Sequence, residues 1–199
     1  WADAGLGLIL TGNVQIDRWH LERAGNVAID GKQDADRLAR LRAWSAAAKS
    51  GGARVWMQIS NAGRQTVKAI NPHPKAPSAV KLNLPGGQFG DPVALTEPEI
   101  LDFIARFGNA AAVARDTGFD GVQIHGAHGY LLSEFLSPRA NLRTDRWGGS
   151  IENRARFLLE TIKAVRAATA PDFAVSVKLN SADFQKGGFS GEDSLKVAE

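Results

Sequence analysis

Residues 121–132 read Gly121-Val122-Gln123-Ile124-His125-Gly126-Ala127-His128-Gly129-Tyr130-Leu131-Leu132. In the first half of this segment the apolar residues Val122 and Ile124 alternate with the polar residues Gln123 and His125. A period of two residues is typical of a β-strand with one apolar and one polar face. The glycines that follow favour a turn. We therefore predict a strand whose carboxyl end carries polar side chains.

Working outward, strand-like and helix-like segments alternate along the chain. The predicted strands span Gly5–Thr11, Arg54–Ser60, Phe119–His125 and Phe173–Asn180. The predicted helices run over Asp34–Lys49, from a capping box at Thr96 to near Gly118, and from an N-cap at Ser150 to Pro171, and a fourth begins at Ser190. The order is therefore a repeated β/α unit.

The loops after the predicted strands are much longer than the loops before them, about twenty or thirty residues against a few. In parallel α/β folds ligands bind at the carboxyl ends of the strands. Polar residues at Gln58, His125 and Lys178 lie near those ends, so we expect them to converge on one pocket. Strands covered by helices on both faces are apolar on both faces, and these are not. The pattern predicts an α/β fold of the (β/α)8 TIM-barrel class, with four of the eight β/α units present.

A doubly wound dinucleotide-binding sheet is the competing fold. It requires G-x-G-x-x-G at a strand-to-helix turn, with the glycines approaching a bound pyrophosphate. Here Gly5-Leu6-Gly7 lies inside a predicted strand and no third glycine is in place. The sequence therefore favours the barrel.

One long segment, Lys68–Asp91, is rich in proline and glycine. Such residues interrupt helices and strands. We expect this segment to be an irregular excursion, with a short hairpin, over the functional face of the barrel.

Composition excludes several classes of protein. The 199 residues are 44% hydrophobic and 23% charged, with a net charge of +3 and no cysteine. This is typical of a globular domain, and 24 basic residues interleaved with 21 acidic ones leave no block for nucleic-acid binding. No apolar run is long enough for a membrane span, and the first residues, Trp1–Ala4, do not show the basic region followed by an apolar region that is typical of a signal peptide. Without cysteine there is no disulfide, thiolate metal site or cysteine nucleophile.

Three candidate catalytic side chains cluster in the sequence at His125, His128 and Tyr130. Two imidazoles can donate hydrogen bonds to one carbonyl oxygen, and a phenol that stays protonated at neutral pH can supply a proton. The alternative interpretation is structural: His125 would be a hydrogen-bonded histidine of the core, His128 a surface histidine and Tyr130 a packed aromatic residue. A third reading makes the histidines metal ligands, although no carboxylate partner is evident.

Gly118–Arg156 closely resembles a characteristic segment of the Old Yellow Enzyme family of FMN-dependent NAD(P)H oxidoreductases and ene-reductases. The resemblance extends through Leu8–Gly12, Gln58–Arg64 and Lys178–Phe184. It covers essentially the whole chain, as barrel strands two to five of a family member about twice as long.

The resemblance implies roles for individual residues. His125 and His128 match the pair, His with His or Asn, that binds the substrate carbonyl oxygen above the flavin, and His125 also borders the cofactor. Tyr130 matches the tyrosine that protonates the α-carbon. Gln58 matches a glutamine that binds the flavin ring. Lys178 stands where many members have an arginine; it keeps the positive charge that would stabilise reduced flavin but loses the bidentate geometry.

For Gln58 and Lys178 a structural role is an alternative to a role in flavin binding, and one further residue, Asn61, departs from the family pattern. Gln58 also fits a hydrogen-bonded interior amide, and Lys178 a lysine that reaches solvent. Asn61 stands where many members have histidine.

The resemblance implies an FMN-dependent enzyme that takes hydride from NAD(P)H and reduces the activated C=C bond of an α,β-unsaturated carbonyl compound. The expected partner is this small-molecule alkene, with no protein-bound metal, nucleic acid or membrane. Two alternatives stay open: a metal-dependent barrel enzyme that uses His125 and His128, and a fragment that is inactive on its own.

We expect residues 1–199 to form part of one barrel domain that is truncated at both ends. The chain does not begin with methionine, and it stops within a predicted helix. We expect a cytoplasmic protein, and the sequence leaves its oligomeric state open.

Overall fold

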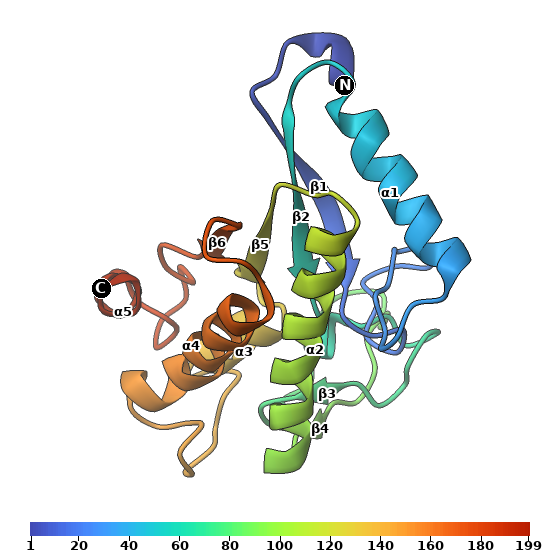
Figure 1. Cartoon of the computed structure of the whole chain (residues 1–199). Coiled ribbons are helices and arrows are strands. Elements are labelled where there is room, and N and C mark those ends of the chain that lie inside the picture. The colour runs from blue at the N-terminus through green and yellow to red at the C-terminus, as the bar shows by residue number, and fades with distance from the viewer.

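A computed structural model describes all residues, 1–199, and its centre is a four-stranded parallel sheet (Figure 1). The strands are β1 (Leu8–Gln15), β2 (Arg54–Ser60), β5 (Gly121–Gly126) and β6 (Ala174–Leu179), in the order β1-β2-β5-β6. The sequence order is also the spatial order, as in a barrel that is built strand by strand. The predicted repeat of strand and helix is confirmed.

Three long helices connect the strands. They are α1 (Ala35–Lys49), α2 (Glu97–Asp116) and α4 (Ile151–Ala168), and shorter helical segments are α3 (Leu131–Leu136), α5 (Gly191–Ala198) and the 3₁₀ turns η1 (Ala2–Ala4) and η2 (Gly63–Gln65). The predicted caps form: Thr96 makes a capping box with Glu99, and Ser150 accepts a hydrogen bond from the Asn153 N–H. None of the helices is long and apolar enough to cross a membrane.

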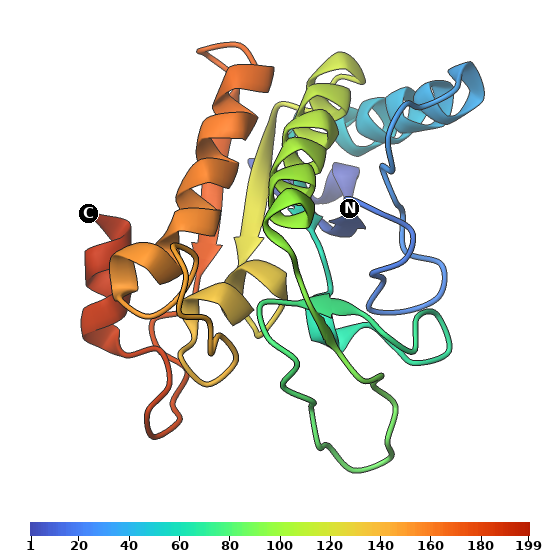
Figure 2. The same cartoon turned by 90° about the horizontal axis from the view of Figure 1, so that it is seen from below.

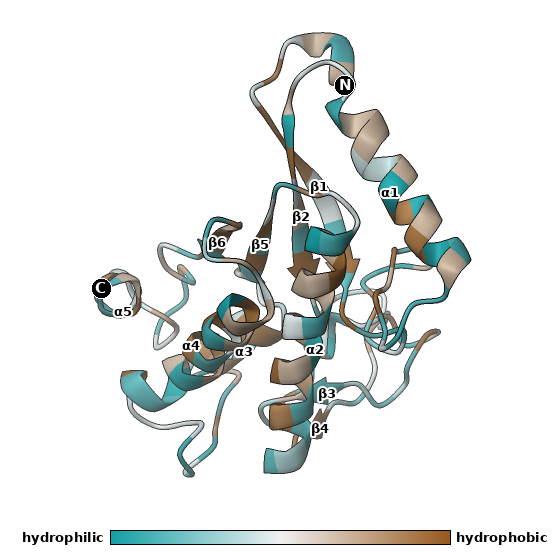
Figure 3. Cartoon of the chain, viewed as in Figure 1, coloured by the Kyte–Doolittle hydropathy of each residue, from teal (hydrophilic) through white to brown (hydrophobic).

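The hydrophobic core lies between one face of the sheet and α2 and α4. Alternate residues of β2 and β5 are fully buried there, and they pack with Ile100, Phe107 and Phe157 of the helices. Figure 3 shows the brown, apolar colouring concentrated in the strands and along one side of α2. The strand residues on this face are Val55, Met57, Ile59, Val122 and Ile124.

The opposite face of the sheet is polar, and this decides between the two candidate folds. Gln58, Gln123 and His125 alternate with the buried apolar residues, and no long helix packs over them. A doubly wound sheet has helices on both faces, whereas a barrel has them only outside. Figure 2 shows the β5 and β6 arrowheads pointing to the side where α3 and the long loops lie. The structure is therefore part of a TIM barrel, as predicted.

The structure also corrects several boundaries. The first strand spans Leu8–Gln15 rather than Gly5–Thr11, because its register with β2 is irregular between Leu10 and Asn13 and pairing resumes beyond it. Helix α3 was not predicted, because its six residues are too few to show a helical period. In α1 only Leu41 and Ser45 are buried, and Trp44 is half-buried.

The predicted hairpin within Lys68–Asp91 is wrong. The region contains one strand of two residues, β3 (Lys75–Ala76), which pairs in parallel with β4 (Val93–Ala94) just beyond the region. A single antiparallel bridge joins Val67, just before the region, to Phe89. On one side of the bridge the chain turns at Gly86 and Gly87, whose φ values are 92° and 57°, so a regular antiparallel ladder does not continue there.

Gly121 is required by the close approach of β5 to its neighbours. A Cβ at this position would lie 2.7 Å from the carbonyl oxygen of Ala174 and 2.8 Å from the indole nitrogen of Trp56. Neither contact is sterically allowed, so a side chain would force β5 and β6 apart.

Gly121→Ala is therefore expected to lower the free energy of unfolding by about 1 to 3 kcal/mol, the usual range for overpacking. Gly12→Ala in β1 is the matched control, since a Cβ there meets nothing within 4 Å. The control is expected to leave stability unchanged or slightly raised. Urea unfolding of both variants checks this, and equal stability of the two would contradict it.

Candidate functional site

The polar face of the sheet carries side chains in two levels. At the first, Gln58 is in register with Gln123, and Gln58 Nε2 donates to Asn13 Oδ1 at 2.5 Å. At the second, His125 is in register with Lys178. Cross-strand neighbours on one face are close enough to interact. The levels correspond to the layers of a barrel interior near the carboxyl ends of its strands.

The three candidate catalytic side chains are brought together at the end of β5. The rings of His125 and His128 lie edge to face with centroids 5.2 Å apart, and those of His125 and Tyr130 with centroids 4.9 Å apart. His125 is buried, Tyr130 is half-buried and His128 is exposed. The predicted cluster therefore forms around the ring of His125.

The backbone at His128 is left-handed, with φ of 62°, and Gly129 follows at 73°. A left-handed histidine is unfavourable unless its surroundings hold it. Here Asn180 Oδ1 accepts the His128 N–H at 3.0 Å, and Gln65 Nε2 donates to the His128 carbonyl at 2.7 Å. Residues that follow β2 and β6 thus fix the turn that follows β5.

The environment keeps both histidines neutral at neutral pH. Burial, followed by the nearby His128 and Lys178, lowers the pKa of His125 to about 4. Burial and Lys178 also lower the pKa of His128. The Ala127 N–H donates to His125 Nδ1 at 3.2 Å, so the neutral ring carries its proton on Nε2. Nε2 is thus available as a hydrogen-bond donor.

Tyr130 is held in the protonated state. Burial, together with the adjacent Glu22 carboxylate, raises the pKa of Tyr130 above its usual value. A phenol that is protonated over the whole working pH range can act as an acid.

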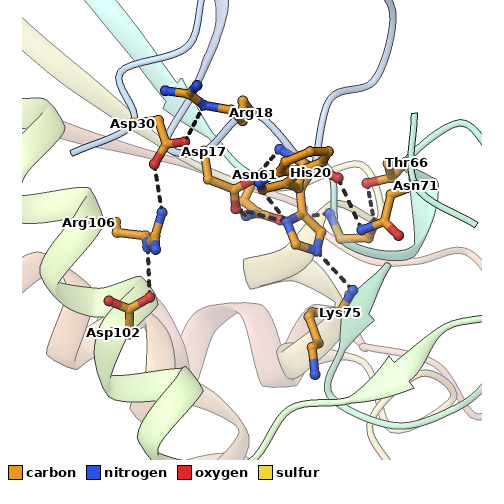
Figure 4. A network of polar contacts seen from close by, with 12 residues as sticks. Asp17, Arg18, His20, Asp30, Asn61, Thr66, Asn71, Lys75, Asp102 and Arg106 are labelled. Carbon is orange, nitrogen blue, oxygen red and sulfur yellow. Dashed lines mark hydrogen bonds and ion pairs between the residues drawn. The ribbon is translucent and has the colours of Figure 1, made fainter. Parts of the chain in front are cut away.

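Asn61, the departure from the family pattern, has a structural role. It is buried at the end of β2, where its Nδ2 donates to Asp17 Oδ2 at 3.2 Å and its Oδ1 accepts the Gly63 N–H at 2.9 Å. Asp17 also contacts His20 Nδ1 at 2.8 Å, and His20 Nε2 accepts the Lys75 N–H. Figure 4 shows this network joining the loops after β1 and β2.

A cavity of about 670 Å³ opens beside His128, between the loops after β2, β5 and β6. Gln58, His125 and Lys178 do not line it, although His128 does. Gln58, His125 and Lys178 share a face of the sheet, at two levels, and Gln58 is in register with Gln123 instead of His125. Their convergence on one ligand pocket stays a prediction.

Glu134 was not among the predicted site residues, because no motif or period marks it. It is fully buried in α3, where burial raises its pKa to about 8. Its Oε1 accepts the Arg64 N–H at 2.9 Å, and its Oε2 has no partner. A Cβ on Gly63 would lie against this carboxylate, so glycine is needed there.

The polar face fits a flavin ring system. The Gln15 amide and the Ser60 hydroxyl, which are adjacent in the β1–β2 register, are fully buried and have no hydrogen-bond partner. Buried polar groups without partners are costly, so such groups point to a ligand. The lysines that form ion pairs are Lys49, Lys75, Lys81 and Lys163, which leaves the Lys178 ammonium free for an anionic ligand.

No cluster of three or more His, Asp or Glu side chains that could hold a metal ion occurs in the chain. His125 and His128 are therefore not part of such a cluster.

Because His125 is a weaker base when folded, acidification should destabilise the protein. The imidazole of His125 binds a proton near pH 6.5 in the unfolded chain and near pH 4 in the folded chain. Between these values the unfolded state holds more protons, so the free energy of unfolding decreases as the pH is lowered. From pH 7 to pH 5 we expect the free energy of unfolding to fall by about 1 to 2 kcal/mol more in the unmodified protein than in His125→Gln.

Urea unfolding at the two pH values measures this difference. The matched control is His73→Gln, which changes an exposed histidine and should retain the full loss. An identical loss in His125→Gln would show that this histidine does not titrate as proposed.

The sequence profile of the NADH:flavin oxidoreductase / NADH oxidase family matches residues 2–198. Among curated proteins, the chain is 39% identical to the NADH-dependent flavin oxidoreductase nadA of Aspergillus parasiticus, over 99% of this chain and 45% of that protein. It is 40% identical to the NADH oxidase of Thermoanaerobacter brockii, over 100% of this chain and 30% of that protein. The chain thus spans less than half of either relative.

Solved structures agree in fold. The chain superposes on 2-naphthoyl-CoA reductase with a TM-score of 0.92 at 28% identity, over 99% of this chain and 31% of the other. It superposes on morphinone reductase with a TM-score of 0.81 at 30% identity, over 96% of this chain and 54% of the other. It superposes on the Old Yellow Enzyme homologue of Zymomonas mobilis with a TM-score of 0.84 at 27% identity, over 98% of this chain and 56% of the other.

Proposed function

Because the chain belongs to the NADH:flavin oxidoreductase / NADH oxidase family, we propose that it forms part of an FMN-dependent enzyme that reduces activated alkenes with NAD(P)H. Bound FMN would supply the hydride chemistry, accepting hydride from NAD(P)H and passing it to the β-carbon of the alkene. The observation that carries the proposal is the cluster of His125, His128 and Tyr130 on the polar face of the sheet.

His125 and His128 would bind the carbonyl oxygen of the substrate. His125 is neutral and presents its Nε2–H, so it can donate a hydrogen bond without holding a positive charge. Donors that are fixed before reaction stabilise the negative charge that develops on oxygen. The hydrogen bonds that fix the backbone of His128 serve the same preorganisation.

Tyr130 would donate its proton to the α-carbon. Its ring packs against His125, so the acid and the carbonyl-binding donor lie next to each other. Because its pKa is raised, the tyrosine is fully protonated before each turnover.

Gln58 and Lys178 would hold the flavin ring, with His125 at its border. Lys178 offers an ammonium that is not used in an ion pair, and Gln58 offers an amide on the same face. A cation beside the ring favours the anionic reduced state. We also propose that residues 1–199 belong to a single barrel domain.

Tyr130→Phe should separate the two halves of the reaction. The flavin is reduced without the proton donor, so this rate is expected to change less than threefold. Alkene reduction needs the proton, so it should slow by about 100-fold or more. Stopped-flow absorbance of the flavin with NADPH, then with 2-cyclohexenone, measures both steps, and equal slowing of the two would reject the role of Tyr130.

Lys178→Met is expected to weaken FMN binding by about 10- to 100-fold, the usual value of a hydrogen bond to a charged group. Lys178→Arg keeps the charge and should stay close to the unmodified protein. Lys186→Met, which changes an exposed lysine on the loop after β6, is the matched control. Quenching of FMN fluorescence gives the dissociation constants, and undiminished binding by Lys178→Met would contradict the assignment.

A further inference from the structure

The cavity beside His128 has two arginine side chains at its wall, Arg64 from the loop after β2 and Arg139 from the loop after α3. Ion pairs with carboxylates are formed by Arg18, Arg37, Arg40, Arg54, Arg106, Arg115, Arg143, Arg146 and Arg154. The two arginines of the cavity are not among them. Their positive charge therefore has no carboxylate partner within the chain.

The guanidinium of Arg64 is held in place, but one of its edges is unused. Arg64 is half-buried, and its Nη1 donates to the Val80 carbonyl at 3.0 Å. Its Nε is buried and has no partner, and its Nη2 is not buried and donates to no protein atom. Nε and Nη2 form one edge of the planar group, and a carboxylate can accept two parallel hydrogen bonds from such an edge. Buried polar groups without partners point to a ligand.

Glu134 lines the same cavity but does not neutralise Arg64. Its Oε1 accepts the backbone N–H of Arg64 at 2.9 Å, and no guanidinium donor reaches the carboxyl group. Burial raises the pKa of Glu134 to about 8, against the opposite effect of the Arg64 charge, so the carboxyl group is mostly neutral at pH 7. The charge of Arg64 is therefore left for a group from outside the chain.

Asp183 is the other carboxylate at the wall of the cavity, and its hydrogen bonds come from uncharged groups. Its Oδ2 accepts the Ser137 hydroxyl at 2.6 Å and the Phe189 N–H at 3.0 Å, and its Oδ1 accepts Asn180 Nδ2 at 3.4 Å. With Glu134 neutral, the two arginines outnumber this carboxylate. A cavity lined by an excess of one charge attracts the opposite charge, here an anion.

The cavity is continuous with the candidate functional site. His128 lines it, and Gln65, the residue after Arg64, donates to the His128 carbonyl at 2.7 Å. Leu82 and Leu179 contribute apolar surface to the wall. A molecule bound at His128 can therefore extend an apolar arm into the cavity, towards a free cation.

We propose that Arg64 binds a carboxylate group of the substrate, so that the enzyme acts on α,β-unsaturated carbonyl compounds that carry a carboxylate on a side arm. The reaction in this inference rests on the proposed function, whereas the binding of a carboxylate does not. The planar guanidinium, fixed by Val80, matches a carboxylate in geometry and charge. The apolar wall would contact the hydrocarbon arm.

Binding of a carboxylate can be measured without turnover. Isothermal titration calorimetry at pH 7 compares 4-phenylbutyrate with 4-phenylbutyramide, which has a similar shape and no charge. The unmodified protein is expected to bind the acid about tenfold or more tightly than the amide, the usual value of a hydrogen bond to a charged group. Arg64→Met should remove this preference, and Arg64→Lys should retain part of it because it keeps the charge but not the planar edge.

Arg166→Met is the matched control. Arg166 is an exposed residue of α4 outside the cavity, and its Nη1 donates to the Phe173 carbonyl, as Arg64 does to that of Val80. The control is expected to keep the preference for the acid. A general distortion of the cavity in Arg64→Met would weaken the binding of both ligands, so the ratio of the two affinities isolates the charge. Equal affinity for acid and amide in the unmodified protein, or a preference that survives Arg64→Met, would overturn the proposal.

The substrate preference is tested on the flavin-loaded protein with 6-oxohept-4-enoate and its neutral amide. The unmodified protein is expected to show a kcat/KM about tenfold or more higher for the acid, and Arg64→Met should remove this difference while leaving the KM for NADPH unchanged. A raised KM for NADPH with an unchanged preference would overturn the proposal, because it would assign Arg64 to the coenzyme phosphates. Arg64-dependent binding of 4-phenylbutyrate by a protein that reduces neither alkene would instead reject the proposed function and leave the carboxylate site in place.

Discussion

The parallel register of the four strands is the constraint on which the site depends. Because side chains alternate between faces, a shift of one residue would bury His125 among the helices and expose Ile124 in its place. The fully buried apolar residues of β2 and β5 oppose such a shift, since each exposed side chain would cost about 1.5 to 3 kcal/mol. The hydrophobic core therefore holds His125 beside Lys178.

Local periodicity predicted the strands and helices well, because each depends on residues that are close in sequence. It placed Gln58, His125 and Lys178 on one face but could not give their levels, which depend on register between strands. Helix α3 was too short to predict. The hydrogen bond between Asn13 and Glu22 was not predicted either, because it joins β1 to the following loop and no helical or strand period records it.

Polar groups at the site are held by hydrogen bonds to residues of other loops rather than to residues of the loop that carries them. His128 is bound by Asn180 and Gln65, and Asn61 joins the loops after β1 and β2 through Asp17. Loops joined in this way restrain one another, so side chains on irregular backbone can keep a fixed geometry. Such support is what a preorganised electrostatic site requires.

The left-handed backbone at His128 also restricts which amino acids can occupy the position at all. Asparagine, aspartate and histidine adopt this conformation several-fold more readily than other residues that have a Cβ, and β-branched residues are nearly excluded. Of the tolerated residues, only asparagine and histidine carry a neutral hydrogen-bond donor. The main chain thus favours a histidine or an asparagine at position 128 for steric reasons, independently of the chemistry that a substrate would require.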